Sequence, residues 1–375
     1  MLAALLDNPG VMIVTVGALV GIAATLVGTF LVLRGTSMLA DAISHSIVFG
    51  IVIVWLLTHQ QSGPLQLIGA ALTGLLTVVL TELLINSKRV RQDAAIGLVF
   101  PLLFSIGVLL LNLHAGNIHV DTHTVLLGEI GFVWLDTVSL GGYEVPRALL
   151  SMGAMTLLNA LFVGLLFKEL KLATFDAALA RALGLAPGVL FHALLLTSGT
   201  AVAAFDAVGA ILFVAFVIVI PATAYLLTDR LTLMLAIGVA VSIGASLAGY
   251  GLAILWDVSI GSMMAVMTGV CLLLAFLFGP RHGLVAQAHE RRRQRRLNES
   301  RTLAVHLYNH EGTPEQGEEN VARALREHLL WPSERAQQAI LKGLDEGYIE
   351  RHGELLQLTA TGRAMAREIL APGRE

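Results

Sequence analysis

Long apolar runs recur along most of this chain, and they limit what it can fold into. A helix needs about 20 mostly apolar residues to cross the hydrocarbon core of a bilayer. Runs of this kind lie roughly at 11–33, 38–57, 64–86, 95–113, 147–167, 187–205, 208–228, 231–255 and 259–279. They predict nine membrane-spanning helices, or eight if the short break at 205–208 lies within one bent element. The chain is therefore predicted to be an all-α polytopic membrane protein.

Charged residues are distributed unevenly between the two parts of the chain. Residues 1–286 contain 10 Lys or Arg and 13 Asp or Glu, whereas the much shorter stretch 287–375 contains 14 of each. The first part has too few polar side chains to cover a water-exposed surface, so we expect lipid around it. These differences predict a transmembrane domain at 1–283, a basic linker at 284–298 and a soluble domain at 299–375.

The basic residues between the apolar runs indicate the orientation in the membrane. Cytoplasmic loops of membrane proteins carry an excess of Lys and Arg. If the C-terminus is cytoplasmic, nine of the ten basic residues in the first part lie on the cytoplasmic side, and only Arg147 lies outside. The connection 114–146 is then extracytoplasmic, and 168–186 is a cytoplasmic segment between spans.

One predicted span contains a carboxylate and an imidazole near its cytoplasmic end. Asp41 and His45, in SMLADAISHSIV, are four residues apart and therefore share one face of a helix. Ionisable groups inside a span are costly and commonly functional. An oxygen and a nitrogen ligand on one face can bind a divalent transition metal. The alternative interpretation is a purely structural Asp–His hydrogen bond within the membrane that only locks helix packing.

A second group of potential ligands lies in the predicted outer loop. The segment GNIHVDTHTVLLGEI at 116–130 places His119, Asp121 and His123 at alternate positions. In an extended segment these side chains point the same way, which makes a metal-entry site possible. A solvated loop that binds no metal is the simpler interpretation.

Five stretches together resemble the permease subunit of the ATP-binding-cassette importers for manganese, zinc and iron. The resemblance covers about residues 10–283, and the outer segment 116–130 is similar to members that favour manganese or iron. The five stretches are VLRGTSMLADAISHSIVFG at 32–50, KRVRQDAAIGLVFPLLFSIGV at 88–108, KELKLATFDAALARALGL at 168–185, DAVGAILFVAFVIVIPATAY at 206–225 and LLLAFLFGPRHG at 272–283.

The resemblance implies roles for particular residues. Asp41 and His45 match the metal-coordinating positions of the family. The segment 171–185 matches the coupling helix that docks on the ATPase subunit, with Phe175, Asp176 and Gly184 at the matched positions.

The resemblance also implies partners and a location. The permease forms a homodimer or heterodimer with a second permease subunit in the bacterial inner membrane. It receives manganese, iron or zinc, with manganese as the leading candidate, from an extracytoplasmic metal-binding protein. The chain has no GxxxxGK[ST] phosphate-binding loop, so ATP is hydrolysed by a separate subunit and the permease is not an enzyme. No permanently bound cofactor is expected.

The last part of the chain predicts a small α+β domain. After the basic run HERRRQRRLN at 289–298, which suits contact with anionic lipids, we expect helices at 299–309 and 318–329. A helix at 333–346, a two-stranded wing at 348–358 and a helix from Thr361 complete the order of a winged-helix domain. The stretch GLDEGYIERHGELLQLTATGR resembles metal-responsive bacterial repressors.

The charges of this domain favour a regulatory or protein-binding role over DNA binding. The predicted third helix contains two basic residues, Arg335 and Lys342, and three acidic residues. A DNA-binding surface needs to be basic. Potential ligands for a cytoplasmic metal ion also occur in this domain, although scattered surface histidines are the simpler interpretation: His306, His310, Glu311 and His352.

Two other functions fit parts of the sequence. An ion-coupled secondary metal transporter would move the ion without an ATPase, but the coupling-helix pattern and the lack of paired inverted repeats disfavour it. A membrane-anchored metal-responsive regulator would use the spans only as an anchor, and eight or nine spans far exceed that need.

Overall fold

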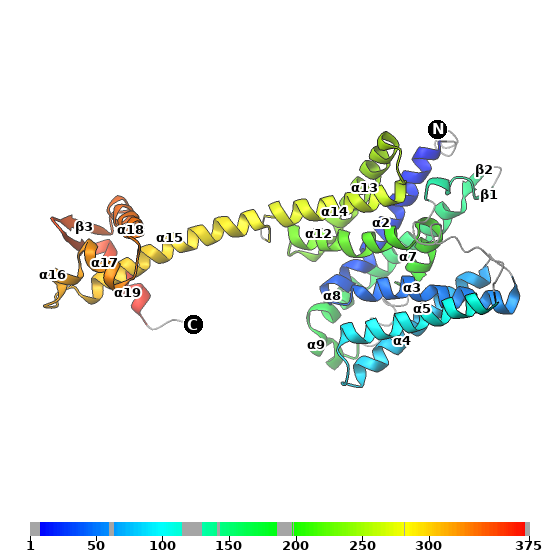
Figure 1. Ribbon diagram of the computed structural model, residues 1–375, viewed down its shortest axis with the longest axis horizontal. Coiled ribbons are helices and arrows are strands. Elements are labelled where there is room, and N and C mark those ends of the chain that lie inside the picture. Colours follow the sequence, from blue (N-terminus) through cyan, green and yellow to red (C-terminus); the bar gives the residue numbers. More distant parts are fainter. Residues whose placement is uncertain are drawn as a thin grey trace. The chain divides into compact units, whose positions relative to one another are not determined.

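The structure is a computed structural model that describes residues 8–59, 64–114, 130–140, 143–185, 197, 199–280 and 282–371. The chain divides into two compact units, Met1–Gly283 and Leu284–Glu375. Figure 1 shows the helices of the first unit in blue to yellow and those of the second in yellow to red.

The described part of the first unit contains eight helices that are long and apolar enough to cross a membrane. A shorter apolar helix, Gly199–Val208, precedes the next span. Gly209, with a φ of +78°, separates the two helices. The predicted span at 187–205 lies largely outside the described residues. The eight are α2 (Pro9–Leu33), α3 (Met38–Thr58), α4 (Pro64–Asn86), α5 (Gln92–His114), α7 (Arg147–Leu165), the composite α11 (Ala210–Val214), η2 (Ala215–Val219) and α12 (Ile220–Leu227), α13 (Leu231–Trp256) and α14 (Ile260–Phe278).

Helix α2 lies at the centre of the first unit and packs through small and hydroxyl side chains. Thr25 Oγ1 and Ser242 Oγ of α13 share a buried hydrogen bond of 3.0 Å. Asn159 of α7 donates to the Ala23 carbonyl oxygen at 3.1 Å. A Cβ added at Gly28 would lie 2.1 Å from the Val217 carbonyl oxygen, so α2 and the π-helical turn η2 are in close backbone contact. Small residues permit such approaches between membrane helices.

Helix α3 is held between α4 and α5 by two glycine contacts. A Cβ at Gly50 would lie 2.1 Å from the Gly69 carbonyl oxygen of α4. A Cβ at Gly107 of α5 would lie 2.9 Å from Phe49 Cα. Since these approaches exclude any side chain, they fix the position of α3 and of the polar residues it carries.

We expect Gly107→Ala to lower the unfolding temperature of the purified chain in detergent, and Gly97→Ala on the same helix not to lower it. Both changes gain helix propensity. Only the new methyl group at position 107 meets the backbone of α3, because nothing lies within 4 Å of a Cβ at Gly97. Overpacking of this kind costs about 1–3 kcal/mol. Equal unfolding temperatures in a thermal scan would show that α3 and α5 are not in close contact.

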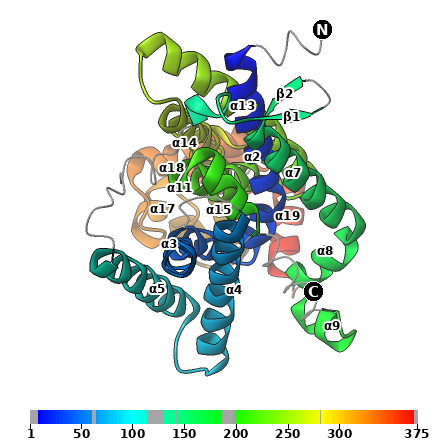
Figure 2. The ribbon, with the colours of Figure 1, turned by 90° about the vertical axis from the view of Figure 1, so that its right-hand side faces the viewer.

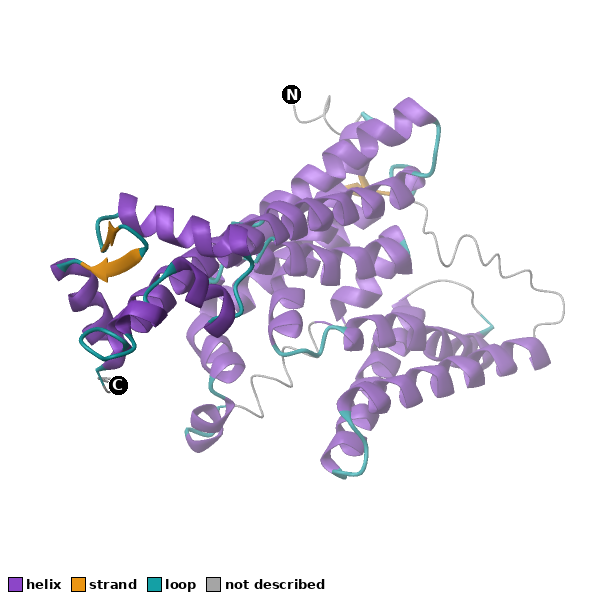
Figure 3. Ribbon diagram, turned by 60° about the vertical axis from the view of Figure 1, so that its left-hand side comes forward, coloured by secondary structure: helices purple, strands orange, loops and turns teal. Residues whose placement is uncertain are grey.

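The second unit is built from helices and one β-hairpin around its own core. Its elements are α15 (Leu284–Asn309), α16 (Gln316–Glu319), α17 (Ala322–His328), α18 (Ser333–Asp345), β3 (Ile349–His352), β4 (Leu355–Leu358) and α19 (Ala360–Leu370). Strands β3 and β4 pair antiparallel, with Ile349 opposite Leu358, and are orange in Figure 3. The core includes Leu303, Leu307, Trp331, Ile340 and Tyr348.

The secondary structure of this unit largely follows the sequence prediction, with two differences. Residues 284–298, predicted as a linker, form the first half of the continuous helix α15. The prediction of a single helix at 318–329 is wrong, because two helices lie there: α16 ends at Glu319 and α17 begins at Ala322. The third helix, the hairpin and the last helix lie where the sequence predicts them. The relation to winged-helix repressors stays a prediction.

Candidate metal site and coupling surface

Asp41 and His45 lie side by side at the N-terminal end of α3. Asp41 is in the first turn, and its Oδ1 is 3.4 Å from His45 Nε2. Two atoms that each lie about 2.1 Å from one ion are about 3.0–3.4 Å apart at octahedral or tetrahedral angles. The pair therefore needs little movement to bind a single ion. The side chains are 33% and 34% exposed, which leaves room for further ligands from outside the chain.

Two aromatic rings of α5 orient the imidazole of His45. The Phe100 ring centroid is 5.8 Å from that of His45, and the Phe104 ring meets it edge-on at 6.3 Å. Sequence reasoning missed these residues. Their spacing of four places them on one face of α5, but the sequence does not reveal that this face meets α3.

The neighbouring serines are bound within their own helix. Ser44 Oγ donates to the Ala40 carbonyl oxygen at 2.9 Å, and Ser46 Oγ donates to the Ala42 carbonyl oxygen at 2.6 Å. Both are buried. The hydroxyl groups of both serines thus donate their hydrogen bonds within α3. The carboxylate of Asp41 and the imidazole of His45 remain as the metal ligands that α3 offers.

The outer group His119, Asp121 and His123 lies outside the described residues. After it, the chain forms a 3₁₀ turn, Ile130–Phe132, and the antiparallel hairpin β1 (Thr137–Leu140) and β2 (Tyr143–Pro146). Arg147 begins α7, and its Nε lies 3.7 Å from Asp136 Oδ2.

The predicted coupling segment forms two short helices, α8 (Phe167–Phe175) and α9 (Ala177–Ala182). Asp176 caps α9, because its Oδ1 accepts a hydrogen bond of 2.9 Å from the Leu179 N–H. Gly184 has a φ of +72°, the left-handed conformation that ends a helix at low cost. Two of the three matched residues therefore define the beginning and the end of α9.

The third matched residue belongs to an exposed apolar ridge. Phe175 ends α8, Leu179 lies within α9 and Leu183 directly follows α9; the three side chains are 60%, 46% and 58% exposed. The opposite side of the segment is held by the buried Ala173 and Ala180. The two leucines were not singled out from the sequence, although the spacing of four is visible there. We call Phe175, Leu179 and Leu183 the α9 ridge.

The hairpin and the α9 ridge belong to opposite ends of α7. The hairpin leads directly into this helix of 19 residues, and α8 and α9 follow it. Figures 1 and 2 both show β1–β2 at one end of α7 and α9 at the other. At about 1.5 Å per residue, α7 is long enough to separate the two faces of a membrane.

Comparison with known proteins identifies the family of the first unit. Residues 11–279 match the ABC 3 transport family. The chain belongs to this family. The chain is 46% identical to the manganese transport system membrane protein MntD of Bacillus subtilis over 278 residues. This match covers 73% of the chain and 94% of MntD.

Other relatives of this ABC 3 chain extend the comparison. The zinc transport system membrane protein TroD of Treponema pallidum is 44% identical over 356 residues, which covers 95% of this chain and 97% of TroD. A solved structure, PsaBC from Streptococcus pneumoniae in complex with Fab, matches with a TM-score of 0.62 and 25% identity over 75% of this chain and 96% of the solved chain.

Proposed function

We propose that this chain is the permease subunit of an ABC importer that moves a divalent transition metal into the cytoplasm. Membership of the ABC 3 transport family carries the proposal, and the eight apolar helices provide the membrane path. The chain itself is not an enzyme, since ATP hydrolysis belongs to a separate subunit. The bacterial inner membrane is the corresponding location, with the second unit in the cytoplasm.

Asp41 and His45 are the proposed ligands for the ion in transit. They provide one oxygen and one nitrogen at 3.4 Å, a mixed set that suits manganese, iron and zinc. One pair supplies fewer ligands than any of these ions requires. A second permease subunit with the same pair would complete the site, and the exposure of about one third on both side chains permits this.

The α9 ridge is the proposed docking surface for the ATPase subunit. The three exposed apolar side chains lie at the end of α8, within α9 and directly after α9, and they offer an apolar surface that can enter a groove of another protein. A rigid short helix of this kind can transmit a domain rotation to the spans. The other end of α7, with the hairpin, is the proposed face for an extracytoplasmic metal-binding protein. His119, Asp121 and His123, which precede the hairpin in the sequence, are the proposed metal-entry residues.

Manganese is the leading candidate for the transported ion, with iron and zinc as alternatives. The names of the relatives mention manganese for MntD, zinc for TroD and chelated iron for YfeC of Yersinia pestis, which is 32% identical over 284 residues. Accumulation of all three ions in cells that express the whole importer tests this. Manganese should accumulate most. Greater accumulation of zinc or iron would identify that ion as the substrate in place of manganese.

We propose a regulatory role for the second unit, as a winged-helix-like domain that does not read DNA. The basic residues of α18 are already paired: Arg335 Nε lies 2.7 Å from Glu299 Oε1 and above the Trp331 ring, and Lys342 Nζ lies 3.7 Å from Glu346 Oε1. A DNA-reading helix would need these charges for phosphates and bases.

A chain that ends at Gly283 should therefore still fold and transport. The first unit has its own core, and the match to MntD covers 94% of that protein with 278 residues. Uptake should persist at low metal but lose or change its response to cytoplasmic metal, because a regulatory coupling energy of about 1–3 kcal/mol corresponds to a change of about 5–150-fold. Gel filtration and uptake assays check both points. Loss of assembly would instead make the second unit a structural component.

A further inference from the structure

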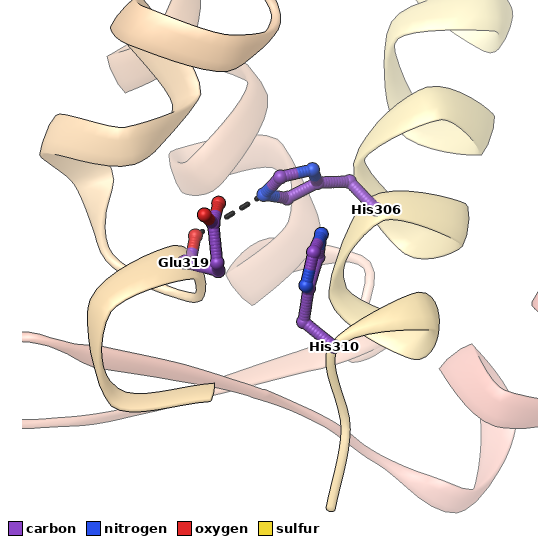
Figure 4. A group of neighbouring side chains, drawn as sticks. All are labelled: His306, His310 and Glu319. Carbon is purple, nitrogen blue, oxygen red and sulfur yellow. Dashed lines mark hydrogen bonds between the residues drawn. The ribbon is translucent and has the colours of Figure 1, made fainter. Parts of the chain in front are cut away.

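Two histidines and a glutamate meet within the second unit, away from the membrane pair. His306 lies in the last turn of α15, His310 directly follows the end of that helix, and Glu319 ends α16. Each residue offers a ligand atom, and the three atoms lie within 4.8 Å of one another. Figure 4 shows the two imidazoles side by side and facing Glu319. The sequence pointed to both histidines, but not to Glu319.

Hydrogen bonds hold this group together before any ligand binds. His306 Nε2 donates to the Glu319 carbonyl oxygen at 3.1 Å. The next residue, Asn320, donates from Nδ2 to the Leu307 carbonyl oxygen at 3.1 Å, and its own carbonyl oxygen accepts from the Leu356 N–H at 2.7 Å. The end of α16 is thereby fixed against α15 between the two histidines.

The surroundings of the group are rich in further ligands. His328 Nδ1 is in contact with Glu319 Oε2, and His310 Nδ1 lies 3.8 Å from Glu315 Oε2. The rings of His306 and His310 have centroids 5.0 Å apart. His306 is 8% exposed, so its imidazole lies inside the second unit.

The two other potential ligands from the sequence lie elsewhere. Glu311 is bound by Arg363, with its Oε1 2.8 Å from the Nη2 of that residue. His352 is on β3, 62% exposed, and lies 3.6 Å from Glu350. The structure thus separates a clustered set from the scattered histidines.

We propose that His306, His310 and Glu319 form a binding site for a divalent transition metal ion of the zinc class, with His328 as a fourth ligand. Two imidazoles and a carboxylate are a common ligand set for Zn²⁺, and a tetrahedral ion holds its ligand atoms about 3.4 Å apart. Small side-chain rotations bring the three atoms from within 4.8 Å to that spacing. In the orientation of the proposed function, this site senses the ion on the cytoplasmic side.

Zinc binding to the full-length chain in detergent tests the site. The parent chain carries Asp41→Ala and His45→Ala, so the membrane pair does not contribute and the result does not depend on transport. Bound Zn²⁺ is counted by equilibrium dialysis and elemental analysis. In this background, His310→Ala and Glu319→Gln should each bind one ion fewer than the parent. The matched control His352→Ala, which also removes an imidazole from this unit, should bind as many ions as the parent.

Thermal unfolding provides a second readout and a check of folding. Without metal, His310→Ala should unfold near the parent temperature, because the His310 side chain is only partly buried. With Zn²⁺ at about 100 times the dissociation constant, the parent gains the stability of a bound ligand and the variant does not. Equal zinc counts in the parent, His310→Ala and Glu319→Gln would overturn the proposal, as would equal stabilisation by Zn²⁺.

Discussion

Asp41→Ala and His45→Ala should each abolish metal uptake by the assembled importer while leaving its ATP hydrolysis without metal largely intact. Each change removes one of the two ligands that α3 provides 3.4 Å apart. We expect uptake to fall by at least about 100-fold, since even outer-shell changes at metal sites cost 10–100-fold. Initial rates of manganese uptake into proteoliposomes measure the effect.

Ser46→Ala is the matched control for this prediction. Ser46 lies beside His45 on α3, but its hydroxyl is buried and bound to the Ala42 carbonyl oxygen. Its loss should leave uptake nearly unchanged. If the Asp41→Ala and His45→Ala variants also transport metal like the parent chain, the Asp41–His45 contact has only a structural role within the membrane.

The double change Phe175→Ala and Leu179→Ala should detach the ATPase subunit from the permease. Truncation of central apolar residues in an interface costs about 2 kcal/mol or more. This is about a 30-fold loss of affinity. Transport should fall with it, because ATP hydrolysis then no longer moves the spans. Co-purification of the ATPase subunit and uptake in the same preparation measure both effects.

Leu165→Ala controls for the loss of an exposed leucine outside the ridge. Leu165 ends α7 and is 77% exposed. Association of the ATPase subunit should be unchanged in this variant. Normal association of the double ridge variant would remove the α9 ridge as the docking surface.

The sequence predicts much of the membrane site because its information is local. A spacing of four residues is enough to place Asp41 and His45 on one face of α3. The packing of His45 against Phe100 and Phe104 is different, because it depends on how α3 and α5 meet. That contact is set by Gly107 against the Phe49 backbone, more than 50 residues away in the chain.

In the second unit, local and long-range information separate in the same way. The stretch at 284–298 is rich in Arg and also contains Ala, Gln and Leu, all of which favour helix. The linker prediction gave more weight to charge than to this propensity. The spacing of His306 and His310 is readable from the sequence. The approach of Glu319 is not, because it follows from the bonds of Asn320 to α15 and β4.

ATP-dependent uptake by a defined importer tests the central claim most directly. The chain is reconstituted in proteoliposomes with or without its ATPase subunit, and manganese accumulation is measured with ATP on the side of the α9 ridge. The proposed function predicts accumulation only when both the ATPase subunit and hydrolysable ATP are present. Accumulation by the chain alone, driven by an ion gradient, would contradict it and make the protein a secondary transporter.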